Sequence, residues 1–342
     1  SSANQPLFIL DGFETELTKI LDLDMNQVES ITSLKDATAK AIYGAKAANG
    51  VIFIETKRPE QGKMRITYTG GIDLEVPDLS SYDLCNASEK LQVEKMAGLY
   101  SSANAVTQIA LDKTYANKLR DVLRGIDTDW LAQPVHTGVG HKHSLYLEGG
   151  QHSLQYGVNL SYNNIEGAMK GSDRNTFSGG VTLAYRLKNI IFRNKLTIDY
   201  NSSNNSPYGS FSNYYRMNPY SRIYDDKGNL IKAYAYTNNA GQVGDYYNPL
   251  YNTTLNTIDN STYTTITNNF YLEWQINQSW RMTGKFGIIR KTTTSDVFKP
   301  ANHTDFISMT DVYRKGTYNQ SNGKYTDINA ELGAQYSKQI GK

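Results

Sequence analysis

The chain has 342 residues, a formal net charge of +2 and 20% charged residues, so its charge gives no reason to expect a nucleic-acid partner. Its 27 glycines and 26 tyrosines favour strands joined by polar turns over a helical protein. A single cysteine, Cys85, excludes an internal disulfide framework. No stretch reaches the roughly 18 apolar residues that a membrane-spanning helix needs, but strands of a membrane β-barrel alternate and average to a polar score.

Residues 28–57 predict a compact α/β element. The run Val28–Leu34 is followed by Asp36, a candidate helix cap, and by an alanine-rich helix that ends at Tyr43 and Gly44. Gly44 suits the left-handed conformation that stops a helix. Asn49 and Gly50 then predict a tight turn before the extended run Val51–Thr56.

The order of these residues resembles the plug-domain signature of the SusC/RagA-like TonB-dependent outer-membrane transporters. Pro6-Leu7-Phe8-Ile9-Leu10-Asp11-Gly12 is similar to the family's strand that ends in an Asp-Gly turn. The other matching stretches are Val28-Glu29-Ser30-Ile31, Leu34-Lys35-Asp36-Ala37, Ala41-Ile42-Tyr43-Gly44 and Ala47-Ala48-Asn49-Gly50-Val51-Ile52. The departures are Asp24-Met25-Asn26-Gln27, where an Asn-Pro-x-Asp turn is common, and Thr32-Ser33, where a more apolar pair is usual.

The resemblance assigns residues 1–60 to the C-terminal part of a plug domain. Because the chain starts inside this signature, we expect it to be a fragment of a longer protein. The residues that carry the plug motif are Asp11, Gly12, Lys35, Asp36, Tyr43, Gly44, Asn49 and Gly50.

From Gly62 onward the apolar residues recur with a period of two, the pattern of a two-faced strand, until Pro77 ends it. A helical loop insertion is expected at about 77–140, because apolar residues in 88–99 and 111–124 recur at helical spacing. Asp127-Thr128-Asp129-Trp130 closes this segment and resembles the Asp-Trp motif that precedes the family's second barrel strand. Gly138-Val139-Gly140 lacks the Lys-Ser/Thr of a phosphate loop and predicts a turn.

Alternation with a period of two then returns and gives roughly eight strands in residues 61–342. Alternation alone fits a soluble sandwich or a lipocalin-like barrel equally well. The apolar face, however, is almost free of charged residues, and a charge at the bilayer midplane costs about 2–4 kcal/mol. Connections also alternate between short (149–151, 188–193, 277–278) and mostly long (77–140, 166–171, 202–260, 292–324), as in outer-membrane barrels.

These patterns predict a mainly β fold. Residues 61–342 would form the first part of a transmembrane antiparallel β-barrel, about eight strands, preceded by part of a small α/β plug domain. Trp274, Trp280 and Tyr336 fall near the short-turn rim, where an aromatic girdle would lie.

No catalytic or metal site is predicted. His141 and His143 point to one side of a strand, but no third ligand stands at a suitable spacing. Neither a Ser-His-Asp, a Cys-His nor a paired-carboxylate arrangement follows from the spacing, so we expect no enzyme activity and no cofactor.

The loop 202–260 concentrates aromatic residues among Asn, Ser and Gly. Aromatic faces that stack on sugar rings, with amides that bond hydroxyl groups, are one use of this mixture, and peptide recognition is another. The alternative is an extracellular loop that packs on itself or meets a partner protein. The candidates for contact with a ligand or partner are Tyr208, Phe211, Tyr214, Tyr215, Tyr246 and Tyr247.

The resemblance implies active import of a large nutrient, a glycan oligosaccharide or a peptide, across the outer membrane of a bacterium. In the family a plug blocks a 22-stranded barrel set in outer-membrane lipid. A SusD-like surface lipoprotein caps the barrel, and the TonB complex pulls on an N-terminal segment that we expect to be missing here. About eight strands cannot close a barrel of that size, so this chain alone should not transport. The rival is a non-transporting surface or adhesion barrel, whose function would survive removal of TonB.

Overall fold

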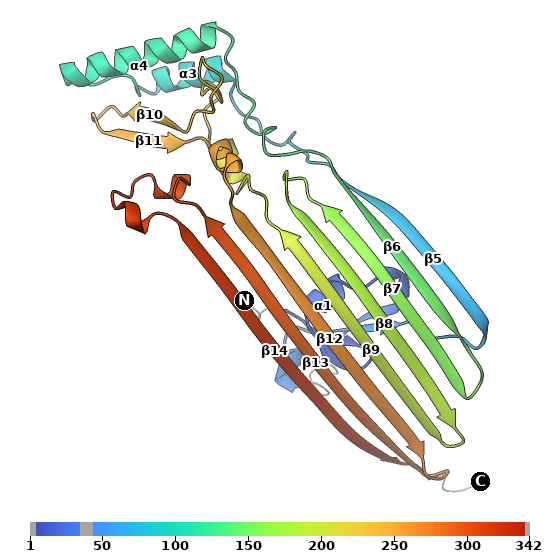
Figure 1. Ribbon diagram of the computed structural model, residues 1–342. Helices are drawn as coiled ribbons and strands as arrows, with labels where there is room; N and C mark the ends of the chain where they lie inside the picture. The colour runs from blue at the N-terminus through green and yellow to red at the C-terminus, as the bar shows by residue number, and fades with distance from the viewer. Residues whose placement is uncertain (1–4, 35–43, 339–342) are drawn as a thin grey trace.

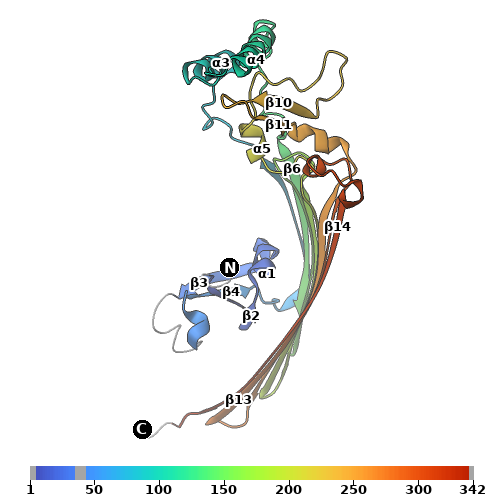
Figure 2. The same cartoon turned by 90° about the vertical axis from the view of Figure 1, so that its left-hand side faces the viewer.

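The structure is a computed structural model that describes residues 5–34 and 44–338. A small N-terminal sheet lies on the concave side of a large curved sheet, and helices and loops gather beyond one end of the large sheet (Figures 1 and 2). The chain therefore has a folded body at its N-terminus, a long wall, and a cap of loops.

The small sheet has four strands in the order β2-β1-β4-β3, with β1 and β4 parallel and the other pairs antiparallel. Ile9, Ala47 and Val51 form its buried centre. Asp11 (φ 52°) and Gly12 (φ 85°) are both left-handed, which a two-residue hairpin turn requires and which Asp-Gly tolerates well. The bounds are β1 Leu7–Leu10, β2 Phe13–Thr15, α1 Leu17–Leu21, η2 Met25–Gln27, β3 Val28–Leu34, η3 Gly44–Ala47 and β4 Val51–Thr56.

The large sheet has eight antiparallel strands in the order β14-β13-β12-β9-β8-β7-β6-β5. The predicted mainly β fold with about eight barrel strands is confirmed, and the two outer strands, β5 and β14, do not pair with each other in the described chain. The bounds are β5 Gly62–Glu75, β6 Gly138–Gly150, β7 Leu154–Glu166, β8 Asp173–Leu187, β9 Ile190–Asn204, β12 Ile258–Gln275, β13 Trp280–Lys299 and β14 Thr317–Tyr336.

The wall strands are longer than the alternation predicts. The sequence placed a loop at 292–324, but β13 and β14 stay paired as far as Lys299 and Thr317. Gly138 and Gly140, predicted to form a turn, instead begin β6. In both places the backbone hydrogen-bond ladder continues beyond the residues whose apolar and polar side chains alternate.

Every second residue of the wall faces outward, and over the middle of the sheet these side chains form an apolar surface. Across the middle of the sheet Leu147, Val158, Val181 and Leu196 are cross-strand neighbours on this face. Trp274, Trp280 and Tyr336 lie at the end with short turns, and the ring centroids of Trp280 and Tyr336 are 5.0 Å apart. This is where the sequence predicts an aromatic girdle.

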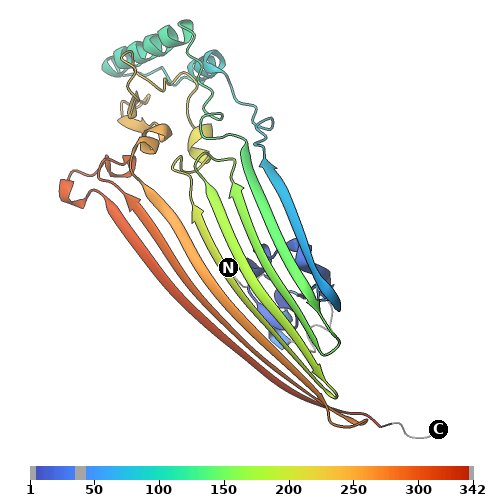
Figure 3. The ribbon, with the colours of Figure 1, turned by 45° about the vertical axis from the view of Figure 1, so that its right-hand side comes forward.

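The long connections lie together at the other end of the wall (Figure 3). One carries α3 and α4; the next contains the hairpin β10–β11, which the sequence did not reveal. No helix in 5–34 or 44–338 is both long enough and apolar enough to cross a membrane. The bounds are α3 Ala87–Met96, α4 Ala105–Leu123, α5 Ser212–Tyr215, β10 Ala233–Thr237, β11 Val243–Tyr247, η4 Pro249–Thr254, η5 Thr304–Phe306 and η6 Val312–Arg314.

Candidate functional site

Asp11, at the Asp-Gly turn, joins the small sheet to the wall. Its carboxylate accepts hydrogen bonds from the Thr56 backbone N–H and hydroxyl, both at 2.8 Å. Lys195 of β9 reaches the same group, with its Nζ 2.6 Å from both Asp11 Oδ2 and Thr56 Oγ1. A residue of the predicted plug motif therefore holds β4 in place and binds the wall through a charge-assisted contact.

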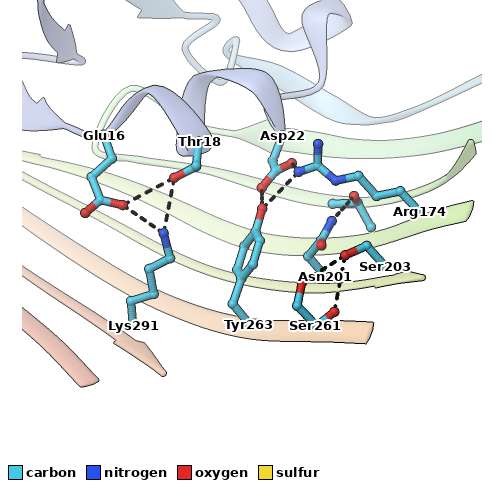
Figure 4. A network of polar contacts seen from close by, with 10 residues as sticks. Glu16, Thr18, Asp22, Arg174, Asn201, Ser203, Ser261, Tyr263 and Lys291 are labelled. Atoms are coloured by element: carbon cyan, nitrogen blue, oxygen red, sulfur yellow. Dashed lines mark hydrogen bonds and ion pairs between the residues drawn. The ribbon is translucent and has the colours of Figure 1, made fainter. Parts of the chain in front are cut away.

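Three ion pairs of alternating sign attach α1 and its flanking residues to the wall. Figure 4 shows the contacts of Glu16 and of Asp22. Glu16 accepts from Lys291 of β13 at 2.9 Å, and Lys19 donates to Asp199 of β9 at 2.5 Å. Asp22 pairs with Arg174 of β8 and also accepts from the Tyr263 hydroxyl of β12.

Along the chain the small domain thus presents an acid, a base and an acid, and each one meets a wall residue of opposite charge. A slip of this helix along the wall would bring like charges together, which is destabilising. The contact therefore fixes the position of α1 against four strands.

A cavity of about 930 Å³ separates the rest of the small domain from the wall. Its floor on the wall side includes Glu148, Arg193 and Tyr271, with the Arg193 guanidinium 4.0 Å from the centre of the Tyr271 ring. Polar and charged side chains from both layers line this space, so the two bodies touch through ionic patches rather than through a shared apolar core.

The remaining motif residues have structural positions or lie outside the described ranges. Gly44 (φ 60°) and Gly50 (φ 90°) adopt left-handed conformations, and Asn49 donates to the Gln5 carbonyl at 3.4 Å. Lys35, Asp36 and Tyr43 lie outside the described residues, as does the predicted helix that Asp36 would cap.

A second cavity, about 850 Å³, opens among the loops at the far end of the wall. Tyr208, Tyr246 and Tyr247 line it, together with amides and hydroxyls from the segments that flank β12. Tyr246 is fixed in place by its hydroxyl contact with Ser221 Oγ at 2.7 Å and by stacking on Tyr234. Burial raises the pKa of Tyr246, so its hydroxyl stays protonated and can both donate and accept.

The other aromatic candidates do not line this cavity. Tyr214 is fully buried beside Trp130 and Leu250, and its hydroxyl donates to the Tyr208 carbonyl at 3.0 Å. It packs the loop and has no exposed surface to offer a ligand, unlike the sequence expectation. Phe211 and Tyr215 instead pack against Tyr82 of the preceding long connection.

A buried polar cluster, which sequence reasoning missed, ties the two largest loops together. The Glu94 carboxylate of α3 accepts hydrogen bonds from the hydroxyls of Tyr100 (2.5 Å) and Tyr220 (2.9 Å). Lys118 of α4 donates to both hydroxyls at 2.9 Å. Burial is the main cause that raises the pKa of both tyrosines and lowers that of Lys118.

The Asp-Trp motif, residues 127–130, also connects these two loops. Asp127 accepts from the Ala87 backbone N–H that opens α3, and the Trp130 indole donates to the Asn218 carbonyl at 3.0 Å. Within 5–34 and 44–338 no three His, Cys, Asp or Glu side chains come together in a way that could hold a metal ion.

The chain was compared with known proteins by sequence and by structure. No protein-family model matches the chain. Over 192 residues, 54% of the chain, it is 29% identical to the TonB-dependent receptor SusC of Bacteroides thetaiotaomicron. Over its whole length it is 24% identical to TonB-dependent receptor P3 of Formosa agariphila. The chain is similar in sequence to SusC-like TonB-dependent receptors.

The matched part is 17% of SusC and 31% of receptor P3, so this SusC-like chain spans less than a third of these relatives. Its fold matches the solved RagAB peptide transporter, with a TM-score of 0.80 over 99% of the chain and 40% of that protein, at 20% identity. The closed-closed state of the RagAB peptide importer gives a TM-score of 0.76 at 21% identity.

The SusC-like chain thus has the fold of part of an outer-membrane β-barrel protein, with its small N-terminal sheet on the concave side of the wall. The outward apolar face meets lipid, and the long loops of such barrels face the cell exterior. The ionic contacts of Asp11 and α1 accordingly lie inside the barrel wall.

Proposed function

We propose that this chain serves TonB-dependent active import of a large nutrient across the outer membrane. In this proposal residues 1–60 act as the plug, residues 61–342 form the first part of the barrel, and residues 77–140 are an external helical loop. The observation that carries the proposal is the seat of the small domain on the inner wall through ion pairs. Such contacts hold a plug closed and can be broken and remade when it is pulled.

The cargo is a glycan oligosaccharide or a peptide, and a SusD-like surface lipoprotein helps to capture it. Support comes from the names of the relatives, SusC and the RagAB peptide importer. The loop cavity fits this role, because aromatic rings and amides can bind either sugar hydroxyls or peptide groups. Tyr208, Tyr246 and Tyr247 are its proposed ligand contacts, whereas Phe211 and Tyr215 are proposed partner contacts.

A reversible cross-link between plug and wall tests whether the plug must move. In the full-length protein in its host, with Cys85 replaced by serine, Asp11→Cys and Lys195→Cys are joined by a reducible thiol cross-linker. We expect uptake of labelled oligosaccharides and of a labelled peptide pool to stop on cross-linking and to return after reduction. The un-cross-linked double variant and each single variant are the matched controls.

Undiminished uptake with a complete cross-link would contradict the proposal. Removal of TonB then distinguishes an importer from the rival, a surface or adhesion barrel. An importer loses uptake without TonB, whereas a surface or adhesion barrel keeps its binding activity, because no energy is needed for adhesion.

A further inference from the structure

One continuous row of side chains crosses the outward face near its loop end. His143, Tyr162, Phe177 and Tyr200 are direct cross-strand partners on β6, β7, β8 and β9. The row continues through Thr264 and Thr292 and ends at Lys324 on β14. Amphipathic rings at this level mark the boundary between hydrocarbon and head groups.

Two cations stand at the β13–β14 end of this row. Arg290 pairs with Thr326, and Thr292 pairs with Lys324, so the two cations are diagonal neighbours on adjacent strands, with Cα atoms about 7–8 Å apart. Both residues are exposed. In the described parts of the chain, neither one forms an ion pair.

The charged side chains around Arg290 and Lys324 on the outward face are mainly positive. Among described residues the nearest outward acid on these two strands is Asp296, whose Oδ1 already accepts from Tyr318 (2.6 Å) and Gln320 (3.0 Å). On the hydrocarbon side the next outward positions are Ile288 and Ile328, which pair with each other. Arg290 and Lys324 therefore stand at the edge of the apolar face, where a charge costs only about 0–1 kcal/mol.

Two unpaired cations spaced this way, flanked by the hydroxyls of Thr292 and Thr326, suit an oxyanion with several acceptor atoms. A phosphate accepts charge-assisted hydrogen bonds from arginine and lysine and would place its acyl chains along the apolar face below. We infer that Arg290 and Lys324 form a binding site for the phosphate of an anionic lipid in the outer leaflet. The site lies on the outside of the barrel and is independent of the transported cargo.

The test measures lipid binding to the purified full-length protein in detergent by native mass spectrometry. Phosphatidic acid is the probe, and phosphatidylcholine is the neutral reference. Each basic residue near an anionic lipid surface contributes about fivefold in affinity, so Arg290→Gln with Lys324→Gln should weaken phosphatidic acid binding about 30-fold. Arg290→Lys, which keeps the charge, should lose less than fivefold.

A matched control removes equal charge at the short-turn end, through Arg186→Gln and Lys188→Asn, and should change affinity less than twofold. Heat-dependent gel mobility verifies that each variant is folded. Equal losses in the test and control variants would overturn the site, since net charge alone would then explain binding. Competition by inorganic phosphate at matched concentration would also overturn it, because the site would then serve a soluble anion. Unchanged phosphatidic acid binding in the folded double variant would also overturn the lipid site, and the two cations would then be candidates for contact with a protein partner.

Discussion

At the residue scale, His303 shows how a buried side chain can make a loop sensitive to pH. It caps η5, where its Nδ1 accepts the Asp305 backbone N–H at 3.2 Å, and it lines the loop cavity. Burial lowers the pKa of His303 from its ordinary value of 6.5. The Asp305 carboxylate opposes this shift, and the cations of Lys299 and Lys232 add to it. The folded loop thus favours the neutral imidazole.

Acid should therefore loosen the segment 300–316. Below pH 6.5 the opened loop binds a proton that the folded loop does not, so its stability falls as the pH drops toward the lowered pKa. We expect hydrogen-exchange protection of 300–316 to decrease over this range, and less so in His303→Asn, whose amide can still cap η5. Protection of the β13–β14 ladder is the internal reference. An identical pH response in both proteins would show that another group titrates.

At the element scale, α1 binds the small N-terminal domain to the wall through a buried ion pair. Asp199 is 3% exposed, and Lys19 is its ion-pair partner. The pair Lys46–Glu14, by contrast, lies at the surface with the lysine side chain 68% exposed. The two pairs differ in burial and therefore in what is lost when one partner is removed.

Lys19→Met should lower the stability of the plug against the wall by about 3–5 kcal/mol, because it leaves a buried carboxylate without a cation. Lys46→Met, which breaks an exposed ion pair within the small domain, should cost about 0–1 kcal/mol. The measurement is urea-induced release of the plug, followed by a fluorophore in the plug while the barrel remains folded. Adding Asp199→Leu to Lys19→Met should recover most of the loss. Equal effects of the two lysine substitutions would show that burial of the pair is unimportant.

The elements that could be predicted from the sequence are those that depend on neighbouring residues in the chain. The turn at Asp11-Gly12, the strands β3 and β4, and the alternation of the wall follow from backbone preference and from one face meeting hydrocarbon. It did not predict α1 or the hairpin β10–β11, because both are short and are held by contacts with distant parts of the chain.

The same limit applies to the site. Asp11 was identified as part of a motif, but its partner Lys195 is 184 positions away, and nothing in the local pattern of β9 marks that lysine among other inward-facing charges. Tyr214 has the same local context as its aromatic neighbours, and only the packed loop shows that it is buried. The cluster around Glu94 likewise joins α3, α4 and a tyrosine 126 positions away from that carboxylate.

At the scale of the whole molecule, two surfaces of one sheet carry out separate tasks. The outward face presents residues such as Leu272 of β12 and Phe286 of β13, each over 40% exposed, to the lipid. The inward face presents Glu273 and Lys285 at the neighbouring positions. The ion pairs of the small domain fit an inner face that is wet, and the apolar outer face fits a membrane.

Site-directed spin labelling in lipid bilayers tests this division most directly. Single cysteines at Leu272, Glu273, Lys285 and Phe286, in a full-length protein with Cys85 replaced by serine, carry a nitroxide label. Labels at Leu272 and Phe286 should be relaxed mainly by oxygen, which concentrates in hydrocarbon. Labels at Glu273 and Lys285 should be relaxed mainly by a water-soluble nickel chelate. If the chelate reaches Leu272 and Phe286, or if those two labels are shielded from both reagents inside a closed apolar core, the sheet is not a membrane wall and the proposed importer is wrong.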